Sequence, residues 1–316
     1  MIKLALTDLD DTLIPFGQPR ASEASRAAIH AVLDAGVHFG PVTGRLPADM
    51  SWMFDNDEAC YATGAFANGQ VVRVDGEVVR EVAIPASALT HAQQVLDEFG
   101  GGAVCLYDPW QLGKIAYITV EAARLRKNPP PTWGDITQVL PAVTDFDTDY
   151  AAENGEPAYV KANIQTTCAD DERTALMELL RREVPELAFV SPSGKAAVID
   201  IVPLGWDKGC GVRVLARALG LAADELVAFG DSENDLAMID AVQNSVAVAN
   251  ASEAVASRAR WHIGACDDAA VDAALLDIAS AAAERRLPRF MTEWGRGPRT
   301  KGLSFCPSSA RPPQNV

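Results

Sequence analysis

The sequence predicts an α/β protein with a doubly wound parallel-sheet core and an inserted α+β domain. The first 45 residues alternate short apolar strands with a helix-forming stretch, which is the pattern of a βαβ unit. The same alternation returns from residue 207, whereas the residues between follow a different order of strands and helices. With 316 residues, the chain is long enough for one large domain or two ordinary ones.

The first part of the core begins with a short apolar strand over residues 2–8. A helix is predicted over 21–36, and the segment 37–45 is predicted to start as a second strand. Two turn signals follow, Asn68-Gly69 and Asp75-Gly76, each flanked by Val-rich runs. Asn-Gly and Asp-Gly favour tight turns between paired strands, so this stretch predicts antiparallel hairpins.

The inserted domain is predicted over residues 84–198, with hinges near 84–86 and 197–202. Two amphipathic helices are expected in it, and residues rich in Pro, Asp and Thr predict a long surface connection over 128–157. The helices are predicted at 86–99 and 171–184, and strands at 103–109, 114–120, 159–168 and 195–202.

The second part of the core resumes the alternation of helices and strands. After it, the chain is rich in Pro, Gly, Arg and Ser, a composition that builds no core, so we expect a flexible basic tail. The predicted organisation is a core at 1–83 and 199–286, the inserted domain at 84–198, and the tail at 287–316.

The composition excludes several classes of partner. A net charge of −16 repels nucleic acid and anionic membranes. No apolar run reaches the roughly 18–20 residues that a membrane helix needs. The chain enters its first strand at once, so we expect no secretory signal. Six cysteines without a CxxC pair argue against a zinc site or a disulfide framework and favour a cytoplasmic location.

Polar residues follow three predicted core strands. Asp8, Asp10 and Asp11 crowd behind the first strand, Thr43 follows the second, and Asp231 follows the strand at 225–230. The carboxyl ends of parallel strands meet at one edge of a sheet, where α/β proteins bind ligands. Residues two apart in an extended chain share a face, so Asp8 and Asp10 can point into the same crevice.

The crowding of carboxylates predicts a divalent cation. Asp8, Asp231 and Asp235 offer hard oxygen ligands, the kind that Mg²⁺ prefers. The cation would neutralise their repulsion and leave room for water and a phosphate. Thr43 and the helix after it could donate hydrogen bonds to phosphate oxygens, and Lys208 would add a positive charge.

These residues resemble the motifs of the haloacid dehalogenase-like hydrolases, and most closely those of the Cof-type phosphatases with a large inserted cap. The motifs occur in order, and the resemblance covers roughly residues 1–275. Asp11 stands where many members have glycine. The resemblance implies a Rossmann-like core with the inserted domain as its cap. The matching segments are D8-L-D10-D11-T12, V42-T43-G44-R45, D207-K208-G209 and G230-D231-S232-E233-N234-D235.

By that resemblance, Asp8 is the nucleophile that forms an aspartyl-phosphate, and Asp10 is the general acid and base. Carboxylates suit both roles. Mg²⁺ would be held by Asp8, by Asp231 and Asp235, and by Asp10 through its backbone carbonyl. The phosphate would be bound by Thr43, Gly44, Lys208 and Asn234.

The expected substrate is a small phosphate monoester, such as a sugar phosphate or a phosphorylated cofactor, and a small phosphorylated metabolite is the expected partner. The inserted domain carries nine Lys or Arg and sixteen Asp or Glu, which disfavours a polyanion. Tyr107, Trp110 and Trp133 could stack on a ring of the substrate, although core packing is the more common use of such residues.

Two other functions stay open: a sugar phosphomutase with the same fold and motifs, and a ligand-binding protein without catalysis. Intact Asp8 and Asp10 count against the second. Asp145, Asp147, Asp149 and Glu156 match part of a calcium loop, but Tyr150 stands where that loop needs glycine, so a solvated acidic loop is favoured. The segment 193–195 (Ser-Gly-Lys) is predicted to be a turn.

Overall fold

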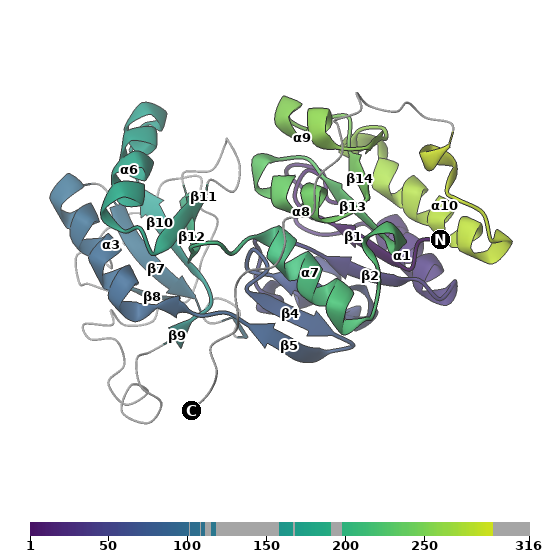
Figure 1. Cartoon of the computed structure of the whole chain (residues 1–316), viewed down its shortest axis with the longest axis horizontal. Coiled ribbons are helices and arrows are strands. Elements are labelled where there is room, and N and C mark those ends of the chain that lie inside the picture. The colour runs from purple at the N-terminus through teal and green to yellow at the C-terminus, as the bar shows by residue number, and fades with distance from the viewer. Residues whose placement is uncertain are drawn as a thin grey trace.

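The computed structural model describes residues 1–100, 102–107, 109–110, 115–117, 158–166, 168–190 and 198–292. Within these residues, a parallel five-stranded sheet and an antiparallel five-stranded sheet lie in two separate parts of the molecule, as Figure 1 shows. The predicted fold class, a doubly wound core with an inserted α+β cap, is confirmed. The predicted connection at 128–157, Trp133, the acidic calcium-like loop and the turn at 193–195 lie outside the described residues.

The core sheet is parallel throughout and runs in the order β15-β14-β13-β1-β2. In the register of its central strands, Thr7 pairs with Pro41 on one side and with Phe229 on the other, so these strands end level. The residues that follow them therefore meet at one edge. The strands are β1 (Leu4–Thr7), β2 (His38–Pro41), β13 (Leu226–Gly230), β14 (Asn244–Ala247) and β15 (Trp261–His262).

Helices cover both faces of the core sheet because successive strand side chains alternate. Ala5 of β1 packs into the cluster with α1 (Glu23–Asp34) and α10 (Ala270–Glu284). Leu4 and Leu6 point the other way, toward α7 and α8. The predicted helices and strands of the core are present, with ends that shift by a few residues. The remaining core helices are α2 (Met50–Met53), α7 (Lys208–Ala218), α8 (Leu236–Ala241) and α9 (Glu253–Arg258).

A small antiparallel sheet confirms the predicted hairpins. It consists of β3 (Gly64–Phe66), β4 (Val71–Val74) and β5 (Glu77–Glu81). Asp75 and Gly76 join β4 to β5 with positive φ angles of 50° and 87°. Both angles lie in the region that Asp and Gly tolerate best, which is why this dipeptide closes a two-residue turn.

The cap contains the antiparallel sheet, ordered β11-β12-β10-β7-β8, and two helices that pack on one of its faces. Both helices, α3 (Ala86–Phe99) and α6 (Asp170–Glu183), lie on the side away from the core (Figure 1). The strands are β7 (Gly102–Tyr107), β8 (Ile115–Tyr117), β10 (Ala162–Thr166), β11 (Leu187–Val190) and β12 (Val198–Pro203). A short pair, β6 (Ile84–Pro85) and β9 (Ala158–Tyr159), lies at its entry.

The start of the predicted tail packs on the core. Phe290 and Met291 are buried in the cluster that also holds α1 and α10, because two large apolar side chains follow each other after Pro288. The limits of the domains, including those of the cap at 84 and 198, stay a prediction. Short 3₁₀ turns complete the core: η1 (Pro47–Asp49), η2 (Glu58–Cys60), η3 (Ala223–Glu225), η4 (Glu233–Asp235), η5 (Cys266–Asp268) and η6 (Arg289–Met291).

Among the described residues, no helix has the length and apolar character needed to cross a membrane.

Candidate active site

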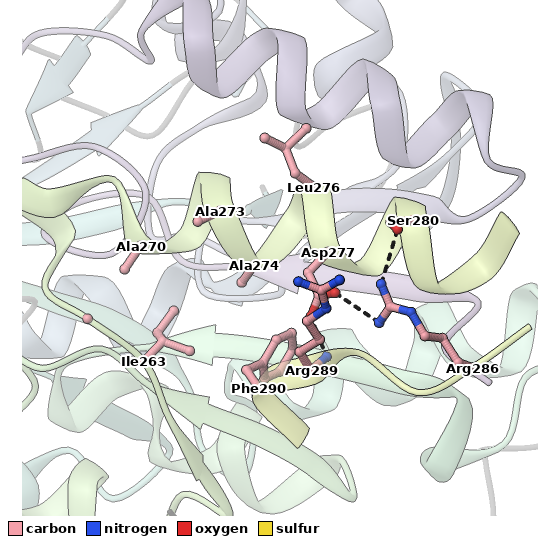
Figure 2. Close-up of a pocket in the computed structure, with 11 residues that line it drawn as sticks. Ile263, Ala270, Ala273, Ala274, Leu276, Asp277, Ser280, Arg286, Arg289 and Phe290 are labelled. Carbon is pink, nitrogen blue, oxygen red and sulfur yellow. Dashed lines mark hydrogen bonds and ion pairs between the residues drawn. The ribbon is translucent and has the colours of Figure 1, made fainter. Parts of the chain in front are cut away.

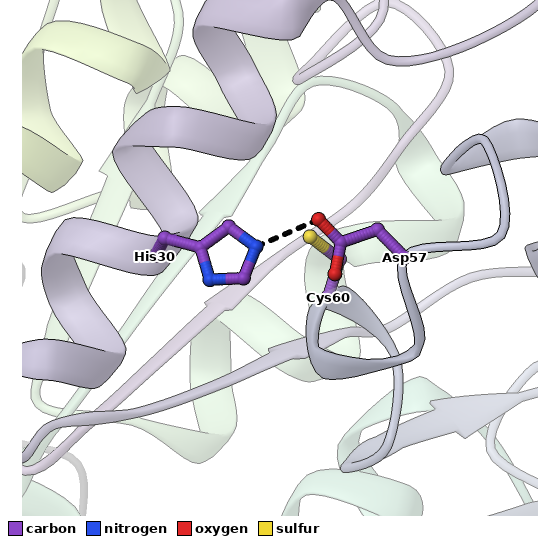
Figure 3. Close-up of side chains that lie close together, drawn as sticks. All are labelled: His30, Asp57 and Cys60. Atoms are coloured by element: carbon purple, nitrogen blue, oxygen red, sulfur yellow. Dashed lines mark hydrogen bonds and ion pairs between the residues drawn. The ribbon is translucent and has the colours of Figure 1, made fainter.

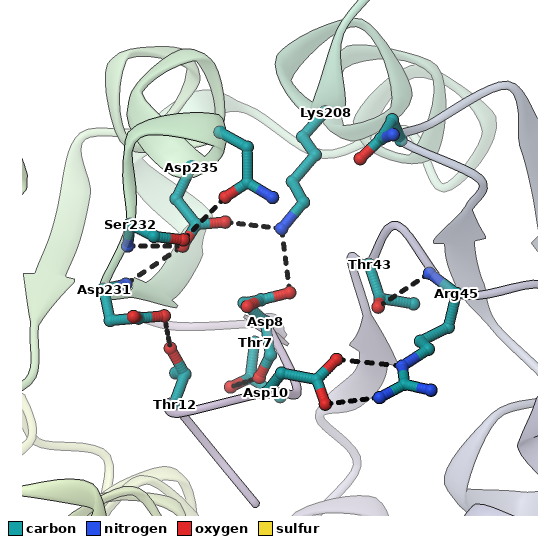
Figure 4. Close-up of polar contacts among 12 residues, drawn as sticks. Thr7, Asp8, Asp10, Thr12, Thr43, Arg45, Lys208, Asp231, Ser232 and Asp235 are labelled. Atoms are coloured by element: carbon teal, nitrogen blue, oxygen red, sulfur yellow. Dashed lines mark hydrogen bonds and ion pairs between the residues drawn. The ribbon is translucent and has the colours of Figure 1, made fainter. Parts of the chain in front are cut away.

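Lys208 lies at the centre of the predicted site and contacts two of its aspartates. The Nζ atom lies 2.8 Å from Asp8 Oδ1 and 2.6 Å from Asp235 Oδ1. All three side chains are buried, and Lys208 is only 1% exposed. Asp207 begins the helix that carries Lys208, because its side chain accepts the Cys210 N–H at 2.8 Å. Figure 4 shows Lys208 reaching from that helix to both carboxylates.

The turn after β13 places Asp231 and Asp235. Asp235 Oδ2 accepts the backbone N–H groups of Asp231 at 3.0 Å and Ser232 at 3.2 Å, which fixes the turn. Asp231 Oδ1 accepts the Thr12 hydroxyl at 2.8 Å (Figure 4). Gly230 is required here, because a Cβ on it would lie 2.8 Å from the Cβ of Asp235. The turns after β1 and β13 are therefore joined through side chains.

The electrostatics of this cluster call for more positive charge than Lys208 supplies. Burial raises the pKa of Asp8 well above its ordinary value; Lys208 opposes this, while Asp235 and Asp231 add to it. Burial, together with Asp235, raises the pKa of Asp231 to about 7. Burial works to lower the pKa of Lys208, but Asp235 and Asp8 outweigh it and raise that pKa. Three carboxylates thus share one ammonium group.

The donor set fits a magnesium ion. One carboxylate oxygen from each of Asp8, Asp231 and Asp235 can be chosen so that all lie within 4.8 Å of one another. All are hard oxygen ligands, and a divalent cation would relieve their repulsion. The Asp10 side chain is outside this group, so a part for Asp10 through its backbone carbonyl stays a prediction.

The Asp10 carboxylate turns to Arg45 rather than to Asp8. Arg45 donates two hydrogen bonds, from Nε at 3.0 Å and from a terminal nitrogen at 2.8 Å (Figure 4). About half of the Asp10 side chain is exposed, which leaves it open to a ligand. Arg45 ends the motif V42-T43-G44-R45, but the sequence pattern alone predicted no role for it. The structure makes it the group that holds the predicted acid and base.

The predicted phosphate-binding residues lie around this cluster. Thr43 is buried, and its hydroxyl oxygen accepts the Arg45 N–H at 3.1 Å, so the hydroxyl caps the turn after β2. Gly44 follows Thr43, and because it has no side chain, the backbone of this turn can lie close to Asn68. Asn234 Oδ1 accepts the Ser232 hydroxyl at 2.7 Å. Phosphate binding by Thr43, Gly44 and Asn234 stays a prediction, as it does for Lys208.

A polar bridge that the sequence analysis missed joins the cap to the turn between β3 and β4. Asn68 donates to Asp200 Oδ2 at 2.8 Å, and Asp200 also pairs with Lys161 at 2.8 Å. Both charged side chains are at least nine-tenths buried. A signal was present, because Asp200 interrupts the apolar run VIDIV. An acid in the middle of a buried strand indicates a partner, but the sequence does not name it.

A second group of potential metal ligands lies beside α1. His30 Nε2 contacts Asp57 Oδ2 at 2.7 Å, with Cys60 next to them (Figure 3). Burial, with help from Asp57, raises the pKa of the Cys60 thiol to about 12, so the thiol stays protonated at neutral pH. The contact ties α1 to the turn at η2.

A cavity of about 450 Å³ lies under α10, and Figure 2 shows its lining. Arg286 spans one side through an ion pair with Asp277 at 3.0 Å, and Phe290 closes another. None of its lining residues belongs to the predicted site.

Comparison with known proteins places the chain in a family. The sequence profile of the haloacid dehalogenase-like hydrolases matches residues 5–275. A phosphatase of the haloalkanoate enzyme superfamily from Bacteroides thetaiotaomicron shares the fold, with a TM-score of 0.67 and 24% identity over 88% of this chain and 95% of that one.

Most of the curated relatives match only a short part of this chain. The chain spans between 10% and 25% of the length of the first four, among them a phosphoglycolate phosphatase from Methanosarcina acetivorans, 46% identical over 55 residues. That match covers 17% of this chain and 24% of the archaeal protein. A longer match is to an HMP-PP phosphatase from Cronobacter sakazakii, 24% identical over 255 residues, which covers 79% of this chain and 85% of that protein. The profile match, which includes all four motifs, decides the assignment: this chain belongs to the haloacid dehalogenase-like hydrolases, in their Cof-type branch with a large inserted cap.

Proposed function

We propose that the protein is a magnesium-dependent phosphatase that hydrolyses small phosphate monoesters through an aspartyl-phosphate on Asp8. The observation that carries the proposal is the buried contact of Lys208 with both Asp8 and Asp235, in a chain of this family. Together with Asp231, this contact gathers three carboxylates and one ammonium group at the edge of the sheet where parallel strands end. A phosphate can bind at such an edge.

Asp8 is the nucleophile in this proposal. Lys208 holds Oδ1 of Asp8, so we assign Oδ2 as the oxygen that attacks phosphorus. The bond between phosphorus and the leaving oxygen then breaks, and the leaving alcohol departs. The ammonium group of Lys208 favours the ionised form of Asp8, which burial opposes. It also stabilises negative charge on the transferred group.

Asp10 is the proton carrier. In the first step it donates a proton to the leaving oxygen, and in the second it takes one from the water that attacks phosphorus. The second step releases inorganic phosphate and restores the Asp8 carboxylate. Arg45 fixes the direction of the Asp10 carboxylate through two hydrogen bonds, so it acts as a positioning residue.

Asp8, Asp231 and Asp235 would hold Mg²⁺, with the Asp10 carbonyl as a further ligand. When bound, the ion supplies positive charge that stabilises the phosphoryl group during transfer. Thr43, Gly44, Lys208 and Asn234 would bind the phosphate oxygens.

The substrate is proposed to be a small phosphorylated metabolite, a sugar phosphate or a phosphorylated cofactor. The relative from Cronobacter sakazakii, which is named as an HMP-PP phosphatase, supports a small phosphorylated compound. The low content of basic residues supports a small substrate rather than a polyanion, and we propose a cytoplasmic location.

The test is release of inorganic phosphate from a panel of sugar and cofactor phosphates, with Mg²⁺, with EDTA, and with the variant Asp8→Asn. We expect release that depends on the metal and falls at least 10³-fold in Asp8→Asn, because an amide is no nucleophile. Asp11→Asn, three residues further along the same segment, is the matched control and should keep its activity. Isomerisation of hexose phosphates without release would identify a mutase, and activity that survives Asp8→Asn would exclude Asp8 as the nucleophile.

A further inference from the structure

The group of His30, Asp57 and Cys60 brings three kinds of metal-binding atom together beside α1. An imidazole nitrogen, a carboxylate oxygen and a sulfur, one from each residue, lie within 4.8 Å of one another. His30 Nε2 lies 2.7 Å from Asp57 Oδ2, and Figure 3 shows the Cys60 sulfur beside that contact, with the imidazole facing both partners. None of the three residues belongs to the predicted phosphatase site. They form a convergent set of donors outside it.

The backbone places two of these donors on one side of a short turn. Asp57 precedes the 3₁₀ turn η2, Cys60 ends it, and the Cys60 N–H donates to the Asp57 carbonyl at 3.1 Å. Residues three apart in a 3₁₀ turn lie one above the other, so the two side chains point the same way. The pair Asp57-x-x-Cys60 thus presents its ligands with the spacing that two cysteines have in many zinc sites.

The third donor stands on a helix that is fixed in the core. His30 lies on α1, whose residues Ile29 and Val32 are buried in the same cluster as Cys60. The His30 side chain is 46% exposed and that of Asp57 27%, whereas Cys60 is buried. An ion can therefore enter from solvent on the side of His30 and Asp57. Its fourth position stays open to water, as in zinc sites with three protein ligands.

The charges around the group suit a dication. Binding releases the thiol proton of Cys60, so that a thiolate and the Asp57 carboxylate together balance two positive charges. Arg26 is the cation that acts on Cys60. Its guanidinium is already engaged by Asp55 at 3.4 Å and by the Ala21 carbonyl at 3.2 Å. The carboxylate of Asp55 thus offsets the positive charge that would oppose the ion.

We propose that His30, Asp57 and Cys60 bind one Zn²⁺ ion per chain, at a site separate from the magnesium cluster. The donor set distinguishes the two ions, because imidazole and thiolate suit zinc, whereas magnesium takes oxygen ligands. The ion ties α1 to the turn at η2 and so stabilises the folded chain. This inference does not depend on the phosphatase function.

The sequence pattern did not reveal this site. The absence of a CxxC pair argued against zinc, but here an aspartate stands in place of one cysteine. The histidine lies 27 residues from that aspartate, so only the packing of α1 brings the ligands together.

The test is titration of the full chain with Co²⁺, a coloured substitute for zinc, with the cysteines kept reduced and Mg²⁺ in excess to occupy the carboxylate cluster. A bond from cobalt to a thiolate gives a charge-transfer absorption in the near ultraviolet that oxygen and nitrogen ligands do not give. We expect this band to saturate at one Co²⁺ per chain. Zn²⁺, which binds such sites more tightly, should abolish the band, whereas more Mg²⁺ should leave it unchanged.

His30→Gln should weaken Zn²⁺ binding at least about 100-fold, because even the loss of a group that merely orients a ligand costs about 10- to 100-fold. Cys60→Ser should abolish the band. Since His30 is nearly half exposed, His30→Gln gives an answer even if Cys60→Ser fails to fold. Zn²⁺ should raise the unfolding temperature of the wild type but not that of His30→Gln.

His91→Gln and Cys210→Ser are the matched controls. His91 is exposed on the cap helix α3, and Cys210 lies on α7, which covers the other face of the core sheet. Both variants should keep the band and the affinity of the wild type. The proposal would be overturned by a wild type without the band, by unchanged affinity in His30→Gln, or by loss of the band in Cys210→Ser.

Discussion

The core sheet and the cap sheet supply polar side chains in two different ways. In the core, Asp8, Thr43 and Asp231 follow the ends of parallel strands. In the cap, Asn163 and Asp200 stand within antiparallel strands, opposite each other in the register. Turns can change in sequence without disturbing a sheet, and they often carry catalytic groups. A strand interior holds its side chains in fixed positions, which suits recognition of a rigid ligand.

The two regions also balance charge differently. The core cluster gathers three carboxylates around Lys208 and keeps a negative excess, which a metal can offset. The cap pairs Lys161 with Asp200 one to one. Mg²⁺ should therefore restore part of the stability that variants in the core cluster lose, whereas it should not change the stability of variants in the cap.

The largest effect is expected for Lys208→Met. The variant leaves Asp8 and Asp235 buried without their cation, which should destabilise the metal-free protein by about 3–5 kcal/mol and reduce kcat at least 10³-fold. Mg²⁺ should restore part of the stability but not the activity. Urea unfolding with EDTA and with Mg²⁺ measures the first, and phosphate release the second. Lys3→Met, which breaks an exposed pair with Glu225, is the control and should cost much less.

The second effect is expected for Asp200→Asn in the cap. It leaves Lys161 buried without a counter-charge and weakens the bond to Asn68, for a loss of about 3 kcal/mol. Mg²⁺ should not reduce this loss, because neither charge belongs to the metal cluster. Thermal unfolding with and without Mg²⁺ checks it. Asp170→Asn is the control, because Asp170 is an exposed partner of Arg173. An equal loss of stability in that variant would mean that the buried bridge stabilises the protein no more than an exposed ion pair.

A smaller effect is expected for Arg45→Lys. Lysine keeps the charge but cannot donate two parallel hydrogen bonds to the Asp10 carboxylate. The value of kcat should fall about tenfold, with little change in KM, since the substrate still binds while its proton donor is misdirected. Steady-state kinetics against pH measure this. Arg258→Lys, which alters the exposed pair with Asp240, should leave kcat unchanged. A rise in KM alone would assign Arg45 to substrate binding.

The smallest effect concerns the pH dependence of metal binding. With a pKa of about 7, Asp231 must lose a proton before it can bind the ion. The apparent affinity for Mg²⁺ should fall about tenfold from pH 8 to pH 6, as calorimetric titration can measure. Because this pKa is higher in the folded chain, the metal-free protein should lose stability as pH rises from about 4 to 7. Asp231→Asn should remove the Asp231 contribution to both trends.

Local sequence patterns were enough to predict the order of strands and helices in the core and the motifs at their ends. A parallel strand and its following turn are local features, so Asp8, Thr43 and Asp231 could be placed at one edge from spacing alone. The turns at Asn68-Gly69 and Asp75-Gly76 in the small sheet could be predicted for the same reason. Family membership also follows from the sequence, because the profile match rests on the same motifs.

Which side chains meet depends on the packing of elements that lie far apart in the sequence. Lys208 reaches Asp8 across 200 residues of sequence, and Asn68 reaches Asp200 across 132. Such contacts depend on how helices and sheets pack and on which rotamers the packing permits, and neither is encoded in a local window. The bond between Arg45 and Asp10 and the burial of Phe290 at the start of the predicted tail belong to the same class. Local patterns fix elements, whereas packing between distant elements fixes the partners of their side chains.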